Sequence, residues 1–181
     1  GAEINLRNGY IEASAKKLNG TNIRFPDITV TGTENLMMAA SLADGVTTLS
    51  NVAREPEIVD LADLLNSMGA NIKGAGTDKI TIQGVKSLSG TVFNIPADRI
   101  EAGTYLVAAA VTKGDITIDG IDPNRLMRVI DKLKNTGAKV EYDDNSISLK
   151  MDLESPNPVD ITTAPFPEFP TDMQAQFSVI N

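Results

Sequence analysis

The chain repeats itself with a period of 68 residues. Three segments that begin with Gly-Ala start at Gly1, Gly69 and Gly137. Each continues as a short alternating strand, a polar turn and a second alternating strand, a pattern that predicts a β-hairpin. Asn8-Gly9 supplies a strong turn signal in the first copy. Repetition at this length indicates that the chain is built from copies of one supersecondary unit.

The segments between the hairpins match as well. "GTNIRFPDITVTGTENLMMAASLADG" starts at Gly20, and "GTVFNIPADRIEAGTYLVAAAVTKG" starts at Gly90. Each predicts a strand, a loop and an Ala-rich helix that ends at a glycine. A further strand follows, predicted at residues 47–52 in the first copy and 115–118 in the second.

A second helix completes the predicted pattern in both copies. It begins at Pro56 or Pro123, since proline suits the first helical position, and it ends at the glycine of the next hairpin. Each unit therefore reads strand–helix–strand–helix–strand–strand.

The fold class predicted from this repeat is α/β, with two complete βαβαββ units at residues 20–89 and 90–157. Residues 1–19 supply the terminal hairpin of an earlier unit, and residues 158–181 supply the opening strand and helix of a further one. We expect the chain to be an excised piece of a longer protein. Incomplete units leave open strand edges, which favour self-association of the chain.

Composition excludes several classes of site. The chain contains no His and no Cys, which excludes a Ser-His-Asp triad, a thiolate nucleophile, a disulfide and a His- or Cys-liganded zinc. The net charge of -8 argues against a nucleic-acid-binding surface. No apolar run is long enough to span a membrane, and no signal peptide is recognisable. We therefore expect a cytoplasmic protein without metal, cofactor, nucleic-acid or membrane partners.

The candidate site residues lie where the first strand of each unit leads into the first helix. Backbone N–H groups at a helix N-terminus favour anions. For Thr29, Thr31 and Asp98 a role as helix N-cap is the favoured interpretation over anion binding, and Glu55 and Asp122 suit caps or first-turn carboxylates even better. Asp172 lies in a loop framed by prolines, where partial burial suits a general base, although a capping role stays open.

Three motifs resemble the UDP-N-acetylglucosamine 1-carboxyvinyltransferase family. They are "NVAREPEIVDLADLLNSMGANIKGAGTDKITIQGV", "ADRIEAGTYLVAAA" and "TAPFPEFPTDMQAQF". The resemblance covers essentially the whole chain, and the last motif separates this family from its shikimate-pathway sister. It implies an inside-out α/β barrel with two domains, an active site between them, and a crossing between the domains near Ile95 to Asp98.

The resemblance also implies a reaction. Members transfer the enolpyruvyl group of phosphoenolpyruvate to the 3-hydroxyl of UDP-N-acetylglucosamine, the committed step of bacterial peptidoglycan synthesis, without a cofactor. Asp172 matches the carboxylate that accepts the hydroxyl proton, with Thr171 beside it. Asp27, Ile28, Thr29 and Val30 match the loop that meets the UDP-sugar, with Thr29 near the diphosphate and Thr31 flanking it. Glu55, Asp98 and Arg99 match supporting positions. Some members carry a lysine near the place of Asp27, and the acidic side chain here departs from that pattern.

Other residues that the family reaction needs are expected outside this chain. They are a mobile loop with a cysteine (aspartate in some members), a Lys-Asn pair for phosphoenolpyruvate and an arginine-rich segment, all upstream, and one arginine downstream. We therefore expect the 181-residue chain alone to be inactive. Two alternatives stay open: a non-catalytic module that binds a sugar nucleotide or a protein, and a shikimate-type enolpyruvyl transferase.

Overall fold

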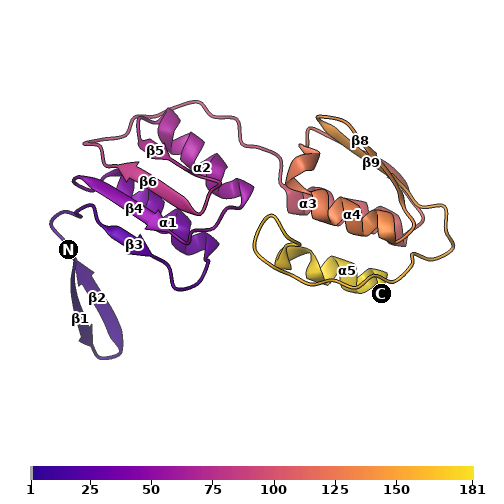
Figure 1. Ribbon diagram of the computed structural model, residues 1–181, viewed down its shortest axis with the longest axis horizontal. Helices are drawn as coiled ribbons and strands as arrows, with labels where there is room; N and C mark the ends of the chain where they lie inside the picture. The colour runs from indigo at the N-terminus through magenta and orange to yellow at the C-terminus, as the bar shows by residue number, and fades with distance from the viewer. Residues whose placement is uncertain (1) are drawn as a thin grey trace. The chain divides into compact units, whose positions relative to one another are not determined.

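The computed structural model describes residues 2–181. The chain divides into two compact units, Gly1–Asn94 and Ile95–Asn181, which Figure 1 shows with their elements labelled. No helix among residues 2–181 has the length and apolar character that crossing a membrane requires.

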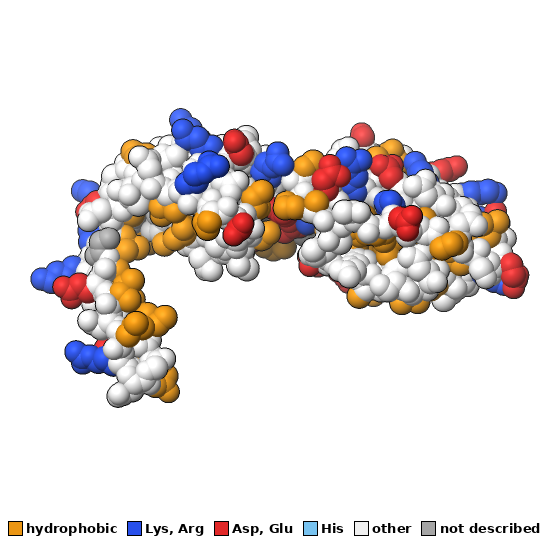
Figure 2. All heavy atoms as spheres, turned by 60° about the horizontal axis from the view of Figure 1, so that its bottom comes forward, with side chains coloured by type: hydrophobic (Ala, Val, Ile, Leu, Met, Phe, Trp, Pro, Cys, Tyr) orange, Lys and Arg blue, Asp and Glu red, His pale blue; other side chains and the backbone are white. Residues whose placement is uncertain are grey.

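The first unit opens with the predicted hairpin, formed by β1 (Glu3–Arg7) and β2 (Tyr10–Ser14). Asn8 and Gly9 both have positive φ, 51° and 81°, as a two-residue hairpin turn requires. The register pairs Leu6 with Ile11 on one face of this two-stranded sheet. Every residue of both strands is exposed, and Figure 2 shows hydrophobic side chains along the hairpin.

The remaining strands of the first unit form one four-stranded sheet. Its order is β3 (Asn22–Arg24), β4 (Val46–Ser50), β6 (Lys79–Gln83) and β5 (Asn71–Lys73). β3 pairs with β4 in parallel, and the other pairs are antiparallel. This arrangement confirms the predicted strands of the first copy.

Two helices pack on this sheet and on each other, α1 (Val30–Ser41) and α2 (Pro56–Ser67) (Figure 1). Their apolar stripes meet alternate strand residues, because side chains of a strand point to opposite faces in turn. The largest fully buried side chains of this core are Met37, Leu49, Ile58, Ile80 and Ile82.

The second unit repeats the pattern, but its sheet has three strands where the larger sheet of the first unit has four. It contains α3 (Arg99–Val111), β7 (Asp115–Asp119), α4 (Met127–Asn135), β8 (Lys139–Tyr142) and β9 (Ser146–Lys150). The sheet order is β7-β9-β8, with both pairs antiparallel. The short 3₁₀ helix η2 (Thr171–Met173) and α5 (Gln174–Ile180) close the chain.

The closing helix belongs to the core of the second unit. Met173 and Phe177 are completely buried, and Phe177 meets Phe169 edge-on with ring centroids 5.1 Å apart. α5 packs along α3 (Figure 1). The segment predicted as the opening of a further unit is therefore integrated into the second one through its helix.

Two predictions about strands were wrong. Residues 84–98 and 154–162 contain no strand in the structure, although opening strands were expected after Gly90 and near residue 158. In the first unit the equivalent strand β3 is stabilised by pairing with β4. Within residues 2–181 neither segment has a paired strand beside it, and a strand without a partner leaves its backbone groups to water.

The helix expected to start at Pro123 is divided. A 3₁₀ turn, η1 (Pro123–Arg125), precedes α4, and Leu126 separates them with φ -130°. Leu126 is buried and its N–H bonds to the Pro123 carbonyl, three residues back. The first turn is therefore a tighter 3₁₀ turn, and Leu126 is buried where it ends. Sequence patterns do not distinguish such a turn from the first turn of an α-helix.

Candidate functional site

Thr29 caps α1, which confirms the capping role predicted from the sequence. Its Oγ1 accepts a hydrogen bond from the Gly32 N–H at 3.2 Å. Thr33 anchors the same turn, because its hydroxyl donates to the Thr29 carbonyl at 2.7 Å and accepts from the Ala53 N–H at 3.2 Å. A Cβ added at Gly32 would lie 2.5 Å from Thr29 Cγ2, so the tight turn requires glycine. The sequence did not single out Thr33, whose importance depends on a contact 20 residues away.

The residues around this cap form an exposed edge of the first unit. Asp27 and Ile28 precede the helix and are exposed, while Val30 and Thr31 begin it. At the start of a helix the backbone N–H groups have no partner four residues earlier, and they point away from the helix. This edge can therefore offer backbone donors to an anion even though its side chains carry no positive charge.

Acidic side chains surround the helix starts of the first unit. Glu55 occupies the N-cap position of α2 but makes no capping hydrogen bond with its side chain, so its predicted capping role is not confirmed. Burial raises the pKa of Glu34 above its usual value, and the negative charges of Glu57 and Glu55 raise it further. The negative charges of these side chains do not favour a phosphate, whereas the backbone N–H groups at the helix start do.

The raised pKa of Glu34 predicts a pH-dependent stability. The folded state binds this proton more tightly than the unfolded state. The stabilisation that the bound proton provides is therefore complete at pH values below the ordinary glutamate pKa of 4.5 and is lost as pH rises through the folded pKa. We expect Glu34→Gln to stabilise the chain at pH 7 by about 0.2–0.5 kcal/mol, as for other like-charge contacts on helices. Urea unfolding at pH 7 and pH 4 should show this gain shrinking at the lower pH. The exposed Asp63→Asn on α2 is the control, and an equal gain at both pH values contradicts the prediction.

Asp98 caps α3 in the second unit. Its Oδ1 accepts hydrogen bonds from the backbone N–H groups of Ile100 at 2.8 Å and Glu101 at 3.2 Å. Asp122 caps the following 3₁₀ turn, with its Oδ1 2.9 Å from the Asn124 nitrogen. The capping predictions for both aspartates are confirmed.

We expect Asp98→Ala to reduce the free energy of unfolding by about 1 kcal/mol, because two helix N–H groups lose their acceptor. Asp98→Asn keeps a capping oxygen and should retain most of the stability. Chemical denaturation of the three proteins measures this difference. Equal stability of the alanine and asparagine variants would show that the cap contributes nothing.

Arg99 begins α3 and is buried, with 6% of its surface exposed. Its guanidinium carbon lies 5.9 Å from the centre of the Phe166 ring, a cation–π contact. Arg99 therefore contacts the loop of residues 164–170, which leads directly into Thr171 and Asp172.

Thr171 and Asp172 lie in the 3₁₀ turn before α5, and both are exposed. The Thr171 hydroxyl approaches Asp172 Oδ1 at 3.5 Å. The expected partial burial of Asp172 is wrong for this chain, because the buried residues of the turn are its neighbours Phe169 and Met173. The exposed carboxylate is accessible to a substrate hydroxyl.

The second unit brings the starts of α3 and α5 together. The Gln176 amide donates to Thr104 Oγ1 at 2.9 Å. Met173 packs so closely on Gly103 that an added Cβ would lie 3.0 Å from the Met173 sulfur. Four of the predicted residues, namely Asp98, Arg99, Thr171 and Asp172, thus sit on two packed segments of one unit.

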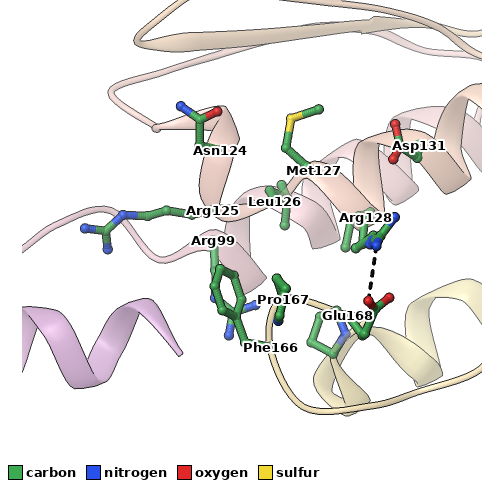
Figure 3. A pocket seen from close by; sticks show the side chains of 12 residues that line it. Arg99, Asn124, Arg125, Leu126, Met127, Arg128, Asp131, Phe166, Pro167 and Glu168 are labelled. Carbon is green, nitrogen blue, oxygen red and sulfur yellow. Dashed lines mark hydrogen bonds and ion pairs between the residues drawn. The ribbon is translucent and has the colours of Figure 1, made fainter. Parts of the chain in front are cut away.

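A cavity of about 290 Å³ lies between the loop 164–170 and the start of α4. Figure 3 shows it, with Arg128 of α4 facing Glu168 of the loop. The Arg128 Nη2 and Glu168 Oε1 atoms are 3.1 Å apart. Sequence reasoning missed this pair, since 40 residues separate its members. Among residues 2–181, no group of three or more acidic side chains is placed to hold a metal ion.

One known protein family matches the chain over its full length. The family model of EPSP synthase (3-phosphoshikimate 1-carboxyvinyltransferase) matches residues 1–181. The chain belongs to the EPSP synthase family.

Within the EPSP synthase family, the chain is similar to proteins named UDP-N-acetylglucosamine 1-carboxyvinyltransferase. It is 54% identical over 181 residues to that of Ruthia magnifica subsp. Calyptogena magnifica, covering 100% of this chain and 43% of the relative. The protein of Aeromonas hydrophila subsp. hydrophila is 53% identical over 182 residues, which cover 100% of this chain and 44% of that relative. The resemblance drawn from the three motifs is confirmed. The chain spans less than half the length of these relatives.

Solved structures of EPSP synthase-family members share the fold. The enolpyruvyl transferase NikO from Streptomyces tendae superposes with a TM-score of 0.82 at 23% identity, over 98% of this chain and 45% of that one. EPSP synthase from Acinetobacter baumannii superposes with a TM-score of 0.61 at 23% identity, over 90% of this chain and 39% of that one. These likenesses confirm the predicted enolpyruvyl transferase-like α/β fold.

Proposed function

We propose that this chain is part of an enzyme that transfers the enolpyruvyl group of phosphoenolpyruvate to the 3-hydroxyl of UDP-N-acetylglucosamine and releases phosphate. The observation that carries this proposal is the 54% identity, over every residue of the chain, to proteins named for that reaction. The reaction places the enzyme in peptidoglycan synthesis in the bacterial cytoplasm.

Asp172 is the proposed general base. Its carboxylate is exposed at the start of the 3₁₀ turn before α5, with the Thr171 hydroxyl beside it. It accepts the proton of the sugar 3-hydroxyl, so that the oxygen bonds to C2 of phosphoenolpyruvate while C3 takes up a proton. Loss of a C3 proton and of phosphate then restores the double bond.

The start of α1 is the proposed contact for the UDP-sugar. Asp27 and Ile28 lie in the exposed loop, Thr29 supplies a hydroxyl, and Val30 and Thr31 supply helix-start N–H groups. A diphosphate suits these donors, because the helix dipole favours negative charge at this end. Asp98 and Arg99 act in support by fixing the start of α3, and Glu55 by its place at the start of α2.

The test is phosphate release by the purified full-length protein with phosphoenolpyruvate and either UDP-N-acetylglucosamine or 3-phosphoshikimate. We expect release with the sugar nucleotide only, and none from the isolated 181-residue chain. Release with 3-phosphoshikimate alone would establish the shikimate-type alternative. Binding of the sugar nucleotide without release would establish the non-catalytic alternative.

We further propose that the isolated chain self-associates through the β1–β2 hairpin. Leu6 and Ile11, paired on one face, are 78% and 73% exposed, and exposed apolar strand faces favour association. Sedimentation velocity should show a concentration-dependent oligomer that Leu6→Lys with Ile11→Lys abolishes. Asn5→Lys with Ser14→Lys adds the same charge to the opposite face and should leave the oligomer intact. A monomer at all concentrations contradicts the proposal.

A further inference from the structure

The loop of residues 164–170 is closed by hydrogen bonds between its own backbone groups. The Ala164 N–H bonds to the Phe169 carbonyl at 3.0 Å, the Glu168 N–H bonds to the Pro165 carbonyl at 3.1 Å, and Phe169 is buried against Phe177. Its central residues, Phe166 to Glu168, instead border the cavity of about 290 Å³ at the start of α4. Apolar packing therefore does not fix the middle of the loop on this side.

Two cationic side chains reach this part of the loop from the helices. Arg99 of α3 lies over the Phe166 ring, and Arg128 of α4 forms an ion pair with Glu168 (Figure 3). Both members of the ion pair are about half exposed, so the contact is weak and open to screening by salt. It nevertheless bridges the cavity at the residue that immediately precedes Phe169.

Asp172 follows this loop without an intervening element. Only Phe169, Pro170 and Thr171 separate it from Glu168, and the 3₁₀ turn begins at Thr171. A displacement of Glu168 therefore acts on Phe169, the buried residue that anchors the entry of the turn that presents the carboxylate. General-base catalysis is sensitive to displacements of this kind, because the base must lie within hydrogen-bond reach of the proton.

We propose that Arg128 and Glu168 are positioning residues for Asp172, acting through the loop of residues 164–170. This inference rests on the proposed function, in which Asp172 is the general base. The pair contacts no substrate itself. Its ion pair narrows the range of loop positions, so that the carboxylate is presented in the reactive orientation in a larger fraction of encounters.

The experiment uses the full-length protein and four variants. Arg128→Gln and Glu168→Gln each break the ion pair, and Arg128→Glu with Glu168→Arg restores it with reversed polarity. Asp152→Asn is the matched control, because it breaks the exposed ion pair with Lys139, which lies on β8 away from the loop. None of these substitutions removes a buried side chain, so all four proteins should fold.

The positioning role predicts a specific kinetic pattern. Each single variant should lower kcat about two- to fivefold with KM unchanged for both substrates, and the reversed pair should recover the parent kcat. At saturating substrate, added salt should lower kcat of the parent and leave the single variants unchanged. Parent-like kcat in the single variants, or failure of the reversed pair to restore it, overturns the role.

Hydrogen exchange keeps this test separate from that of the function. The backbone amides between residues 166 and 172, which exclude the two prolines, should exchange faster in Arg128→Gln than in the parent and in the reversed pair, with Asp152→Asn unchanged. If the parent releases no phosphate from the two substrates, the proposed function and the catalytic part of this inference fail together. In that case hydrogen exchange still tests whether the ion pair restrains the loop. Unchanged exchange in Arg128→Gln overturns that restraint.

Discussion

Replacing Asp172, the proposed general base, by asparagine in the full-length protein is expected to lower kcat of the proposed reaction by about 10²- to 10⁴-fold, the range that general acid–base catalysis contributes. Asparagine has nearly the same shape but cannot accept the proton of the sugar hydroxyl. Asp172 is exposed, and its contact with the Thr171 hydroxyl is long, at 3.5 Å. The substitution should therefore leave the free energy of unfolding and the KM for UDP-N-acetylglucosamine nearly unchanged.

Steady-state phosphate release with both substrates measures this effect. Asp144→Asn is the matched control, because Asp144 is also exposed in the second unit and lies in the turn between β8 and β9. It should keep the parent kcat. If Asp172→Asn retains more than about a tenth of the parent kcat, a general base worth at least 10²-fold is excluded at this position.

Replacing Phe177 by alanine is expected to cost about 3–5 kcal/mol of unfolding free energy in the second unit. Phe177 is completely buried and meets Phe169 edge-on at 5.1 Å with an interplanar angle of 90°. The alanine variant loses the transfer free energy of the ring, leaves a cavity between α3 and α5, and removes the aromatic pair. A loss of this size can exceed a third of the stability of a typical domain.

Urea unfolding followed by hydrogen exchange measures this loss, because exchange reports the second unit separately from the first. Val179→Ala on the same helix is the control, since Val179 is 69% exposed and should change stability by less than about 0.5 kcal/mol. A loss below about 1 kcal/mol for Phe177→Ala would show that α5 is only loosely attached to the second unit.

Local patterns predicted most of the elements correctly. The Asn8-Gly9 turn and the proline at the start of α2 act within a few residues, so their structural consequence can be read along the chain. Thr29 and Asp98 could be identified as caps for the same reason, because a cap bonds to N–H groups two or three residues away. The repeat then extended each local prediction to its equivalent copy.

The mistaken predictions share a different cause. A strand is stable only when another strand pairs with it, and residues 91–95 have β-type sequence but no strand partner among residues 2–181. The burial of Asp172 was misjudged because its apolar neighbours Phe169 and Met173 point into the core while the carboxylate does not. Neither outcome is a property of the segment by itself.

By itself, the sequence determined the βαβαββ order of the first copy, most of the elements of the second and the family to which the chain belongs, because these depend on periodicity, capping and motif spacing along the chain. Only the tertiary structure decided that α5 packs on α3, that Thr33 holds the Ala53 backbone, and that Arg128 meets Glu168 across a cavity. These contacts join residues 20 to about 70 positions apart, and their existence depends on how the packed helices and loops place side chains in space.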